Sequence, residues 1–154
     1  MQLSEILKPG AVRSLWQVTS KKRLFQELAD LANAEYKLNI SEVVDALQER
    51  ESLGPTGVGH GVALTHARLH GLDNVVGLFL GLEKPLDFDA VDRQPVDLIF
   101  ALLAPESSGV DHLKALALVS RTLRDNDLRA KLRANDDATA LHAVLSAAQG
   151  IKAA

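Results

Sequence analysis

The chemically versatile side chains of this chain are histidines and arginines, because the sequence contains no cysteine. That absence excludes thiol catalysis, disulfides and cysteine-ligated zinc. The imidazoles that remain as candidates for nucleophilic or acid–base chemistry are His60, His66, His70, His112 and His142. One of them, His66, is distinguished by the stretch that precedes it.

Residues 53–68 read LGPTGVGHGVALTHAR and open with four glycines in eight residues, at positions 54, 57, 59 and 61. Glycine accepts positive φ and lets other groups approach the backbone closely. The apolar run Val62–Leu64 follows and leads to His66. We therefore expect a short strand that ends on His66 and presents its imidazole with little side-chain bulk around it.

Zinc binding is an alternative use of three of these histidines, since His60, His66 and His70 have the spacing H-x5-H-x3-H. In an extended strand, at about 3.3 Å per residue, roughly 20 Å would separate His60 from His66. Ligand bonds of about 2.0–2.1 Å to one metal do not span that gap unless a tight turn shortens it. A metal site is therefore disfavoured.

A nucleotide site is a second alternative suggested by the glycines. The spacing Gly57-x-Gly59-x-Gly61 differs from G-x-G-x-x-G, runs into an apolar strand rather than a helix, and lacks G-K-[ST]. The sequence thus favours a reactive histidine without a bound cofactor.

Two further residues are placed at predicted helix ends. His112 follows Asp111, the expected N-cap of a helix, where unpaired N–H groups favour an anion. Arg50 is expected at the end of the helix before the glycine stretch, where a cation suits the helix dipole. Taken alone, each could equally be a surface residue.

His70 is interpreted as a surface residue in a polar turn, and His142 as part of an amphipathic helix.

Composition limits the class of protein. With 154 residues, 47% hydrophobic and 24% charged, the chain is expected to form one soluble domain over residues 1–154. Its lysines and arginines are dispersed and the net charge is −3, so neither nucleic acid nor a polybasic membrane surface is indicated. The apolar windows 75–82 and 96–104 are shorter than the roughly 18–20 residues of a membrane span. We expect a cytoplasmic protein that does not insert into membranes.

Hydrophobic periodicity predicts the elements that must position these groups. Strands are expected at residues 11–18 (an edge strand), 62–66, 75–82 (broken by Lys84-Pro85) and 96–103. Helices are expected after caps at Thr19 or Ser20, Ser41, Asp111, Asp125 or Asn126, and Asp136, with Gly150 stopping the last one. The predicted class is α/β, a small mixed central sheet flanked by helices.

The order of these motifs resembles one family, the enzyme IIA domains of the bacterial phosphotransferase system of the fructose/mannitol type, nearest the nitrogen-regulatory branch. The segments that carry the resemblance are Arg50-Glu51, Gly54-Pro55-Thr56-Gly57, Gly61 to Ala67, Phe88 to Leu98 and Ala101 to Leu113. They span essentially the whole chain. Three positions depart from the family pattern: Thr65 replaces proline, Ala67 replaces glycine, and His60 replaces asparagine.

By resemblance, His66 is the phosphoryl acceptor and attacks the phosphohistidine of a small HPr-like carrier, which is itself charged from phosphoenolpyruvate by an enzyme I. The resemblance also implies that His112 and Arg50 stabilise the phosphoryl group, with Thr56 as a further hydroxyl contact. No metal or cofactor is implied. The protein would be a carrier with a phosphohistidine intermediate rather than a free-standing enzyme.

Three functions stay open at this level. The first is a regulatory phosphocarrier whose target proteins, such as potassium-transport, sensor-kinase, stress or nitrogen-control components, respond to roughly two added negative charges. The second is a sugar-transport subunit that passes the phosphoryl group to a IIB domain. The third is a non-phosphorylated binding module, supported only by Thr65. The branch-like segment Asp92 to Leu102 favours the first.

Overall fold

The computed structural model, which describes the backbone of residues 1–153 and the side chains of residues 1–147, contains one five-stranded sheet. Its strands are β1 (Val12–Leu15), β2 (Gly57–Gly59), β3 (Val62–Leu69), β4 (Val76–Leu86) and β5 (Val96–Pro105). They lie in the order β1-β4-β5-β3-β2. The pairs β1–β4 and β3–β5 are parallel, while β4–β5 and β2–β3 are antiparallel. The predicted small mixed sheet is confirmed.

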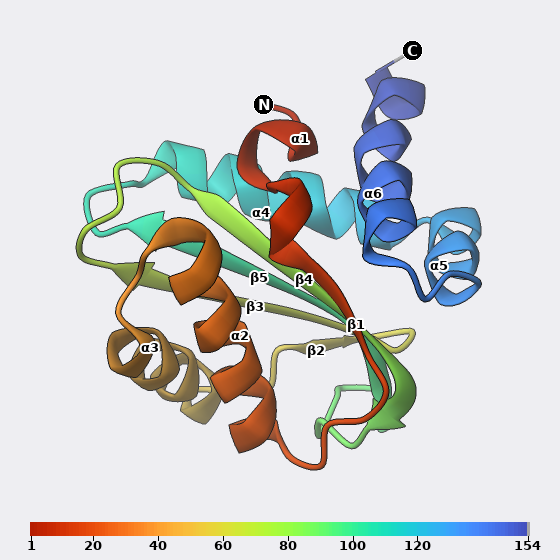
Figure 1. The fold of residues 1–154 in the computed structure, drawn as a ribbon, viewed down its shortest axis with the longest axis horizontal. Coiled ribbons are helices and arrows are strands. Elements are labelled where there is room, and N and C mark those ends of the chain that lie inside the picture. The colour runs from red at the N-terminus through yellow and green to blue at the C-terminus, as the bar shows by residue number, and fades with distance from the viewer. Residues whose placement is uncertain (154) are drawn as a thin grey trace.

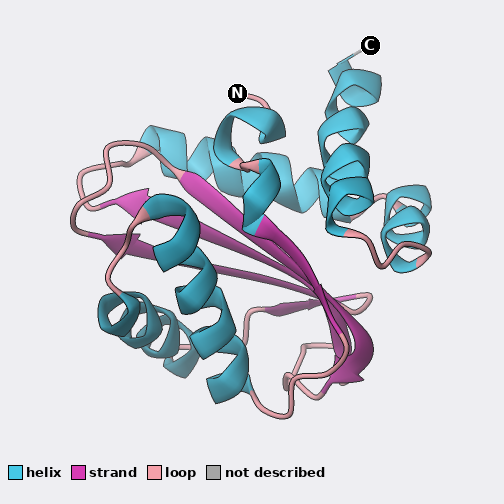
Figure 2. Cartoon of the chain, viewed as in Figure 1, coloured by secondary structure: helices cyan, strands magenta, loops and turns pink. Residues whose placement is uncertain are grey.

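Helices flank this sheet on both sides (Figure 2). They are α1 (Leu3–Ile6), α2 (Lys21–Tyr36), α3 (Ile40–Ser52), α4 (Val110–Leu123), α5 (Asn126–Arg133) and α6 (Ala138–Ala153), with a 3-10 turn η1 (Pro9–Ala11). In Figure 1, α2 lies in front of the sheet and α4 passes behind it. Helix α3 packs on both α2 and β3. Strand β3 is therefore approached by α3 and by α4.

The first two long helices form where periodicity predicts them. Ser20 caps α2, because its hydroxyl accepts a hydrogen bond from the Arg23 amide, and the predicted apolar face is buried. The cap of α3 is a correction: Asn39, rather than Ser41, accepts from the Glu42 amide. Asn39 has the extended backbone that a cap requires, whereas Ser41 already lies inside the first turn.

Two strand boundaries differ from the prediction. Strand β3 does not end on His66 but continues to Leu69, because parallel pairing with β5 holds it over its full length and sets His66 opposite Leu102. Strand β4 continues through Lys84 and Pro85 to Leu86. The pairing register with β5 shifts between Gly81 and Leu86, and an irregular ladder tolerates a residue without an N–H. The edge strand β1 is confirmed, with shorter bounds than predicted.

The C-terminal helices follow the predicted order with shifted ends. Gly109, not Asp111, is the N-cap of α4, and Asp111 lies in its first turn. Asp125 caps α5 as predicted. The carboxylate that accepts from the first turn of α6 belongs to Asp137 rather than Asp136, and the helix continues through Gly150. An interior glycine costs a helix only about 1 kcal/mol relative to alanine, so it is not a stop by itself.

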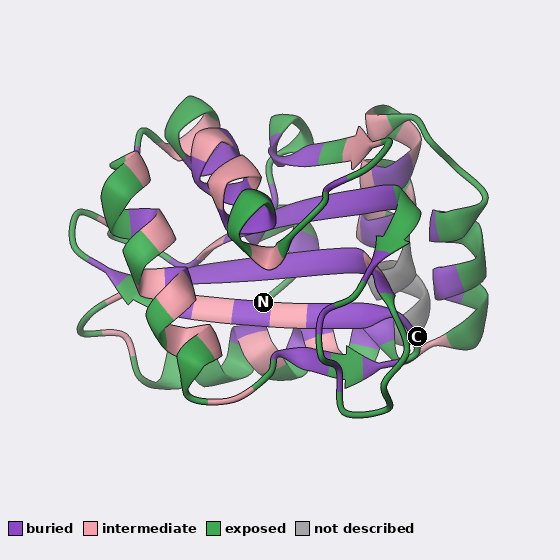
Figure 3. Ribbon diagram, turned by 90° about the horizontal axis from the view of Figure 1, so that it is seen from below, coloured by how far each residue is buried: buried purple, intermediate pink, exposed green. Residues whose placement is uncertain are grey.

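The central strands are almost wholly buried (Figure 3). Phe79 and Phe100 meet between β4 and β5 and are fully enclosed. The glycine stretch is also tightly packed at Gly57, where an added Cβ atom would come within 2.7 Å of the Ala90 Cβ. Beyond it, the β2–β3 turn takes three successive positive φ values at Gly59, His60 and Gly61. This turn is therefore set by backbone conformation, and His60 is its exposed tip.

Candidate functional site

His66 lies where β3 passes between α3 and α4. Arg50 reaches it from the last turn of α3, and His112 from the first turn of α4. The three side chains line one open pocket of about 420 Å³, together with Arg68 and the apolar side chains of Leu53, Leu113 and Leu116. The structure thus brings together three of the four residues that the resemblance singled out.

Arg50 determines which nitrogen of His66 is free to react. Its Nε donates to His66 Nε2 at 3.3 Å, and its Nη1 donates to the Gly54 carbonyl at 3.1 Å. A guanidinium only donates hydrogen bonds, so Nε2 carries the lone pair and Nδ1 carries the proton. Nδ1 is buried and has no hydrogen-bond partner among the described residues. The nucleophilic nitrogen of His66 is therefore Nε2.

His66 is held in its neutral form. Burial lowers its pKa most, and the positive charge of Arg50 and the neighbouring His112 lower it further. The Leu64 carbonyl opposes this shift, although it does not stand in hydrogen-bond geometry to the ring. A neutral imidazole keeps its lone pair at neutral pH, as a nucleophile requires.

His112 presents the complementary arrangement. Arg68 Nε approaches its Nδ1 at 3.5 Å, so the proton lies on Nε2, which is buried and has no partner within the described part of the chain. Burial and then Arg68 lower the pKa of His112 as well. The ring centroids of His66 and His112 are 5.5 Å apart, and the ring planes are inclined by 67°. The site therefore pairs a lone-pair nitrogen with an N–H donor that has unused capacity.

Arg68 is the residue that sequence reasoning missed. The strand predicted over residues 62–66 ended before it, but β3 extends to Leu69 and Arg68 is part of the strand. Side chains two residues apart on a strand point to the same face, so Arg68 lies on the face of His66. The alternation of residues 62, 64, 66 and 68 would have revealed it if the strand had been extended beyond the histidine.

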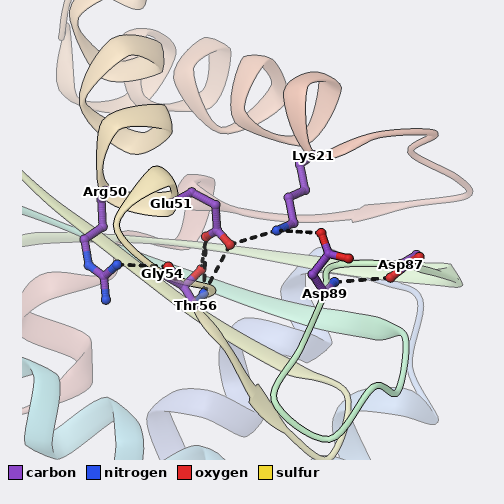
Figure 4. A network of polar contacts seen from close by, with 7 residues as sticks. All are labelled: Lys21, Arg50, Glu51, Gly54, Thr56, Asp87 and Asp89. Atoms are coloured by element: carbon purple, nitrogen blue, oxygen red, sulfur yellow. Dashed lines mark hydrogen bonds and ion pairs between the residues drawn. The ribbon is translucent and has the colours of Figure 1, made fainter.

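Thr56 is not brought into this pocket. Its side chain is buried, and its hydroxyl donates to Glu51 at 2.6 Å (Figure 4). The Thr56 amide also donates to the Glu51 carboxylate, which accepts in addition from Lys21 Nζ at 2.9 Å. Lys21 Nζ also forms an ion pair with Asp89 Oδ2, at 3.4 Å. We call Lys21, Glu51, Thr56 and Asp89 the Glu51 cluster.

This cluster bears on the pocket through the turn that it fixes. Thr56 belongs to the turn that follows α3, and the Gly54 carbonyl of the same turn accepts from Arg50 (Figure 4). Arg50 is thus held between the turn on one side and His66 on the other. The geometry of the arginine depends on a turn that Glu51 anchors.

The other histidines lie elsewhere. His60 does not line the His66 pocket, and its amide donates to Asp92 at the hairpin tip. His70 is 79% exposed and 3.1 Å from Glu106, so its predicted surface position is confirmed. His142 Nε2 lies 3.0 Å from the Leu7 carbonyl. Among the described residues, no group of three His, Cys, Asp or Glu side chains could hold a metal ion.

The rim of the pocket is apolar and exposed. Leu53 and Leu113, which line the pocket, have 80% and 66% of their surface accessible. Large exposed apolar side chains grouped around a polar centre are typical of a protein-binding surface. Over the part of the chain that the structure describes, no helix has the length and apolar character to cross a membrane.

Comparison with known proteins identifies relatives over almost the entire chain. Residues 5–148 match the family described as phosphoenolpyruvate-dependent sugar phosphotransferase system, EIIA 2. A nitrogen regulatory protein of Bradyrhizobium diazoefficiens is 47% identical over 146 residues, which cover 95% of each chain. A nitrogen regulatory protein of Escherichia coli is 38% identical, with 97% of this chain and 93% of that one covered.

A solved structure agrees with this. The crystal structure of nitrogen regulatory protein IIA-Ntr from Neisseria meningitidis superimposes with a TM-score of 0.86 at 37% identity. The superposition covers 93% of this chain and 98% of that one. Both sequence and fold therefore point to the same group of proteins.

Proposed function

The chain belongs to the EIIA 2 family of the phosphoenolpyruvate-dependent sugar phosphotransferase system, and from this premise we propose that it is a regulatory phosphocarrier phosphorylated on His66 Nε2. The observation that carries the assignment of this atom is the bond from Arg50 Nε to Nε2, with Nδ1 buried and protonated. The donor is a small HPr-like carrier protein bearing a phosphohistidine.

In the transfer step, the Nε2 lone pair attacks the phosphorus of the donor's phosphohistidine. A new N–P bond forms at His66 as the N–P bond of the donor breaks, and the donor ring keeps the electron pair of the broken bond. The proton on Nδ1 of His66 stays in place throughout. The reaction therefore exchanges one N–P bond for another, and catalysis consists of positioning and charge stabilisation.

Charge on the transferring group is met by three donors of this chain. Arg50 and Arg68 line the pocket as cations, and His112 Nε2–H has no competing partner among the described residues. Donors set in place before the reaction stabilise developing charge most effectively, because they need not reorganise during the step. Arg50 changes partner, from the lone pair of Nε2 to the oxygens of the phosphoryl group.

The apolar rim of Leu53 and Leu113 supports a protein as the phosphoryl donor, since a small molecule would not need an exposed apolar surface around the site. The same rim would meet the regulated targets. Phosphorylation adds roughly two negative charges at the centre of this surface, which is sufficient to make or break an interface.

For the targets, we infer nitrogen-control proteins, in keeping with the names of the relatives, and potassium-transport or sensor-kinase components from the resemblance noted in the sequence. A cytoplasmic location is part of this proposal. Transfer to a sugar-transport IIB domain is the competing function, and the high coverage of the regulatory relatives favours regulation.

The test is intact-protein mass spectrometry after incubation with phosphoenolpyruvate, enzyme I and an HPr-like carrier. Wild type should gain one acid-labile phosphoryl group, and His66→Ala should gain none. His70→Ala is the matched control, because His70 is exposed on the same strand-and-turn unit, and it should behave as wild type. Absence of uptake from a carrier shown to be charged would overturn the proposal.

Regulation is tested separately from phosphorylation. Phosphorylated and unphosphorylated protein are compared for binding to a potassium-transport component and for transfer to a purified IIB domain. State-dependent binding without transfer supports regulation, whereas rapid transfer to IIB assigns the chain to transport.

A further inference from the structure

A second cavity lies along the same strand and helix that build the His66 pocket. It has a volume of about 160 Å³ and is enclosed by the β2–β3 hairpin, the C-terminal end of α4 and α5. Val62 and Leu64 of β3 line it, on the strand face that carries His66 farther along. Helix α4 contributes Ser120 and Leu123 at this end. The cavity is nevertheless distinct from the His66 pocket, because the two share no lining residue.

The lining of this cavity combines an apolar floor with positive charge. Val62 and Leu123 are 2% and 3% exposed and form the floor. Arg124, Arg129 and the exposed His60 supply hydrogen-bond donors, and none of the lining residues that the structure describes is acidic. Another cavity, which Asp97 and Arg133 line, differs in this respect, since its Arg133 guanidinium is paired with the Asp97 carboxylate at 2.9 Å.

Arg129 is the informative residue, because it is 6% exposed. Its guanidinium donates to the Leu123 carbonyl at 2.9 Å and to the side-chain oxygen of Asn126, both of which are neutral. Removing a guanidinium from water is costly, and a neutral carbonyl compensates less than an anion does. With five N–H donors, Arg129 has capacity left for a ligand.

We propose that this cavity is a binding site for a small organic anion, a short-chain carboxylate whose head meets Arg124 and Arg129 and whose tail lies on Val62 and Leu123. The size follows from the volume, since a cavity of about 150 Å³ holds a molecule as large as benzene, or about six non-hydrogen atoms. Nucleotides and sugar phosphates are too large. The charge follows from the cationic lining, and the apolar tail follows from the floor.

The experiment is a titration of the unphosphorylated full chain with sodium butyrate, followed in ¹H–¹⁵N correlation spectra at constant pH and ionic strength. Butyramide, which has the same shape without the charge, is the matched ligand. Butyrate should produce saturable shifts centred on residues 58–64 and 120–129. Butyramide should bind about tenfold more weakly, the difference expected for a charge-assisted hydrogen bond.

Variants locate the site. Arg124 is exposed, so Arg124→Gln preserves the fold and should weaken butyrate binding about tenfold. Arg121→Gln, one turn earlier on α4 and outside the cavity, should bind as wild type. Arg129→Gln should abolish saturable binding, with the same spectra reporting whether the fold is intact.

The proposal is overturned if butyrate causes no saturable shift, if butyramide binds equally well, or if both Arg124→Gln and Arg129→Gln bind like wild type. Because the titration uses unphosphorylated protein and does not monitor His66, its result is independent of the proposed phosphoryl transfer.

Discussion

The His66 pocket and the Glu51 cluster both adjoin the end of α3, and both are built from charged side chains with a threonine or histidine between them. They differ in how far their hydrogen bonds are satisfied. The Glu51 carboxylate accepts from Thr56 and Lys21 and is only 9% exposed. In the pocket, His66 Nδ1 and His112 Nε2 are buried without partners among the described residues.

This difference distinguishes a structural role, for the Glu51 cluster, from a chemical role, for the His66 pocket. A buried network whose donors and acceptors are matched stabilises one geometry. A buried group with unused hydrogen-bonding capacity costs stability, and of the two in the pocket His112 Nε2–H is the one that an oxygen of the phosphoryl group can satisfy. Arg50 connects the two regions, since it donates both to the anchored turn at Gly54 and to His66.

The largest effect on transfer should come from Arg50→Gln, the link between the two regions. Phosphoryl uptake should slow by about 10²–10³-fold, as when one preorganised donor to a reacting anion is removed. Stability should change by less than about 1 kcal/mol, because Arg50 is partly exposed. Rapid-quench measurement of uptake checks this, with Arg121→Gln as the control. A rate within a few-fold of wild type would remove Arg50 from the reaction.

Glu51→Gln should lower the stability of the fold more than it slows phosphoryl uptake, which is the reverse of the pattern expected for Arg50→Gln. The glutamine keeps the shape but loses the charge that faces Lys21 and turns one acceptor into a donor facing Thr56. We expect a loss of about 1–3 kcal/mol in the free energy of unfolding, measured in urea.

The control for this prediction is Asp89→Asn, because the Asp89 side chain is 81% exposed and its ion pair with Lys21 is screened by water. It should cost no more than about 0.5 kcal/mol. If Glu51→Gln proved as mild as Asp89→Asn, the cluster would not be the anchor of the turn.

The pH dependence of stability should carry the signature of the two pocket histidines. Burial first, and neighbouring charge second, lower the pKa of His66 and of His112 below the usual value of about 6.5. Between 6.5 and the lowered values, the unfolded chain binds more protons than the folded one. Stability is therefore complete above about pH 6.5 and falls as the pH decreases through this window.

Phosphoryl uptake should follow the same protonation, staying level from neutral pH upward and falling only when the pH drops below the lowered pKa of His66. In Arg50→Gln, the pKa of His66 should rise but stay below its usual value, because burial, its larger cause, remains. NMR titration of the imidazole resonances measures both. A pKa of His66 above 6.5 in wild type would contradict the prediction.

The smallest effect is expected at Thr65, the departure from the family pattern next to His66. Thr65 is fully buried on the opposite strand face, and its hydroxyl has no hydrogen-bond partner in the described structure. Thr65→Val should therefore leave uptake within about twofold of wild type and raise stability by up to about 1 kcal/mol. A marked loss of uptake would show that the hydroxyl takes part in transfer.

Local sequence information was sufficient for most of the elements. Apolar periodicity located α2, α3 and the C-terminal helices, because a helix with one buried face repeats every 3.6 residues. Continuous apolar runs located β4 and β5, because a strand that is buried on both faces is apolar at successive positions. The predicted boundaries of several elements were wrong, since Asn39 caps α3, β3 continues past His66, and α6 passes through Gly150. Ends depend on which neighbouring segment supplies the next hydrogen bond, and that neighbour is distant in sequence.

The sequence by itself determined that His66 follows a glycine-rich approach, that Arg50 and His112 occupy helix ends, and that the motifs occur in the order of one family. Only the tertiary structure decided which atom of His66 is free, since this depends on Arg50, sixteen positions away, and on burial of Nδ1. It likewise turned Thr56 toward Glu51 and Arg68 toward His112. A residue's type sets what it can donate or accept, whereas packing against distant segments sets which partner it meets.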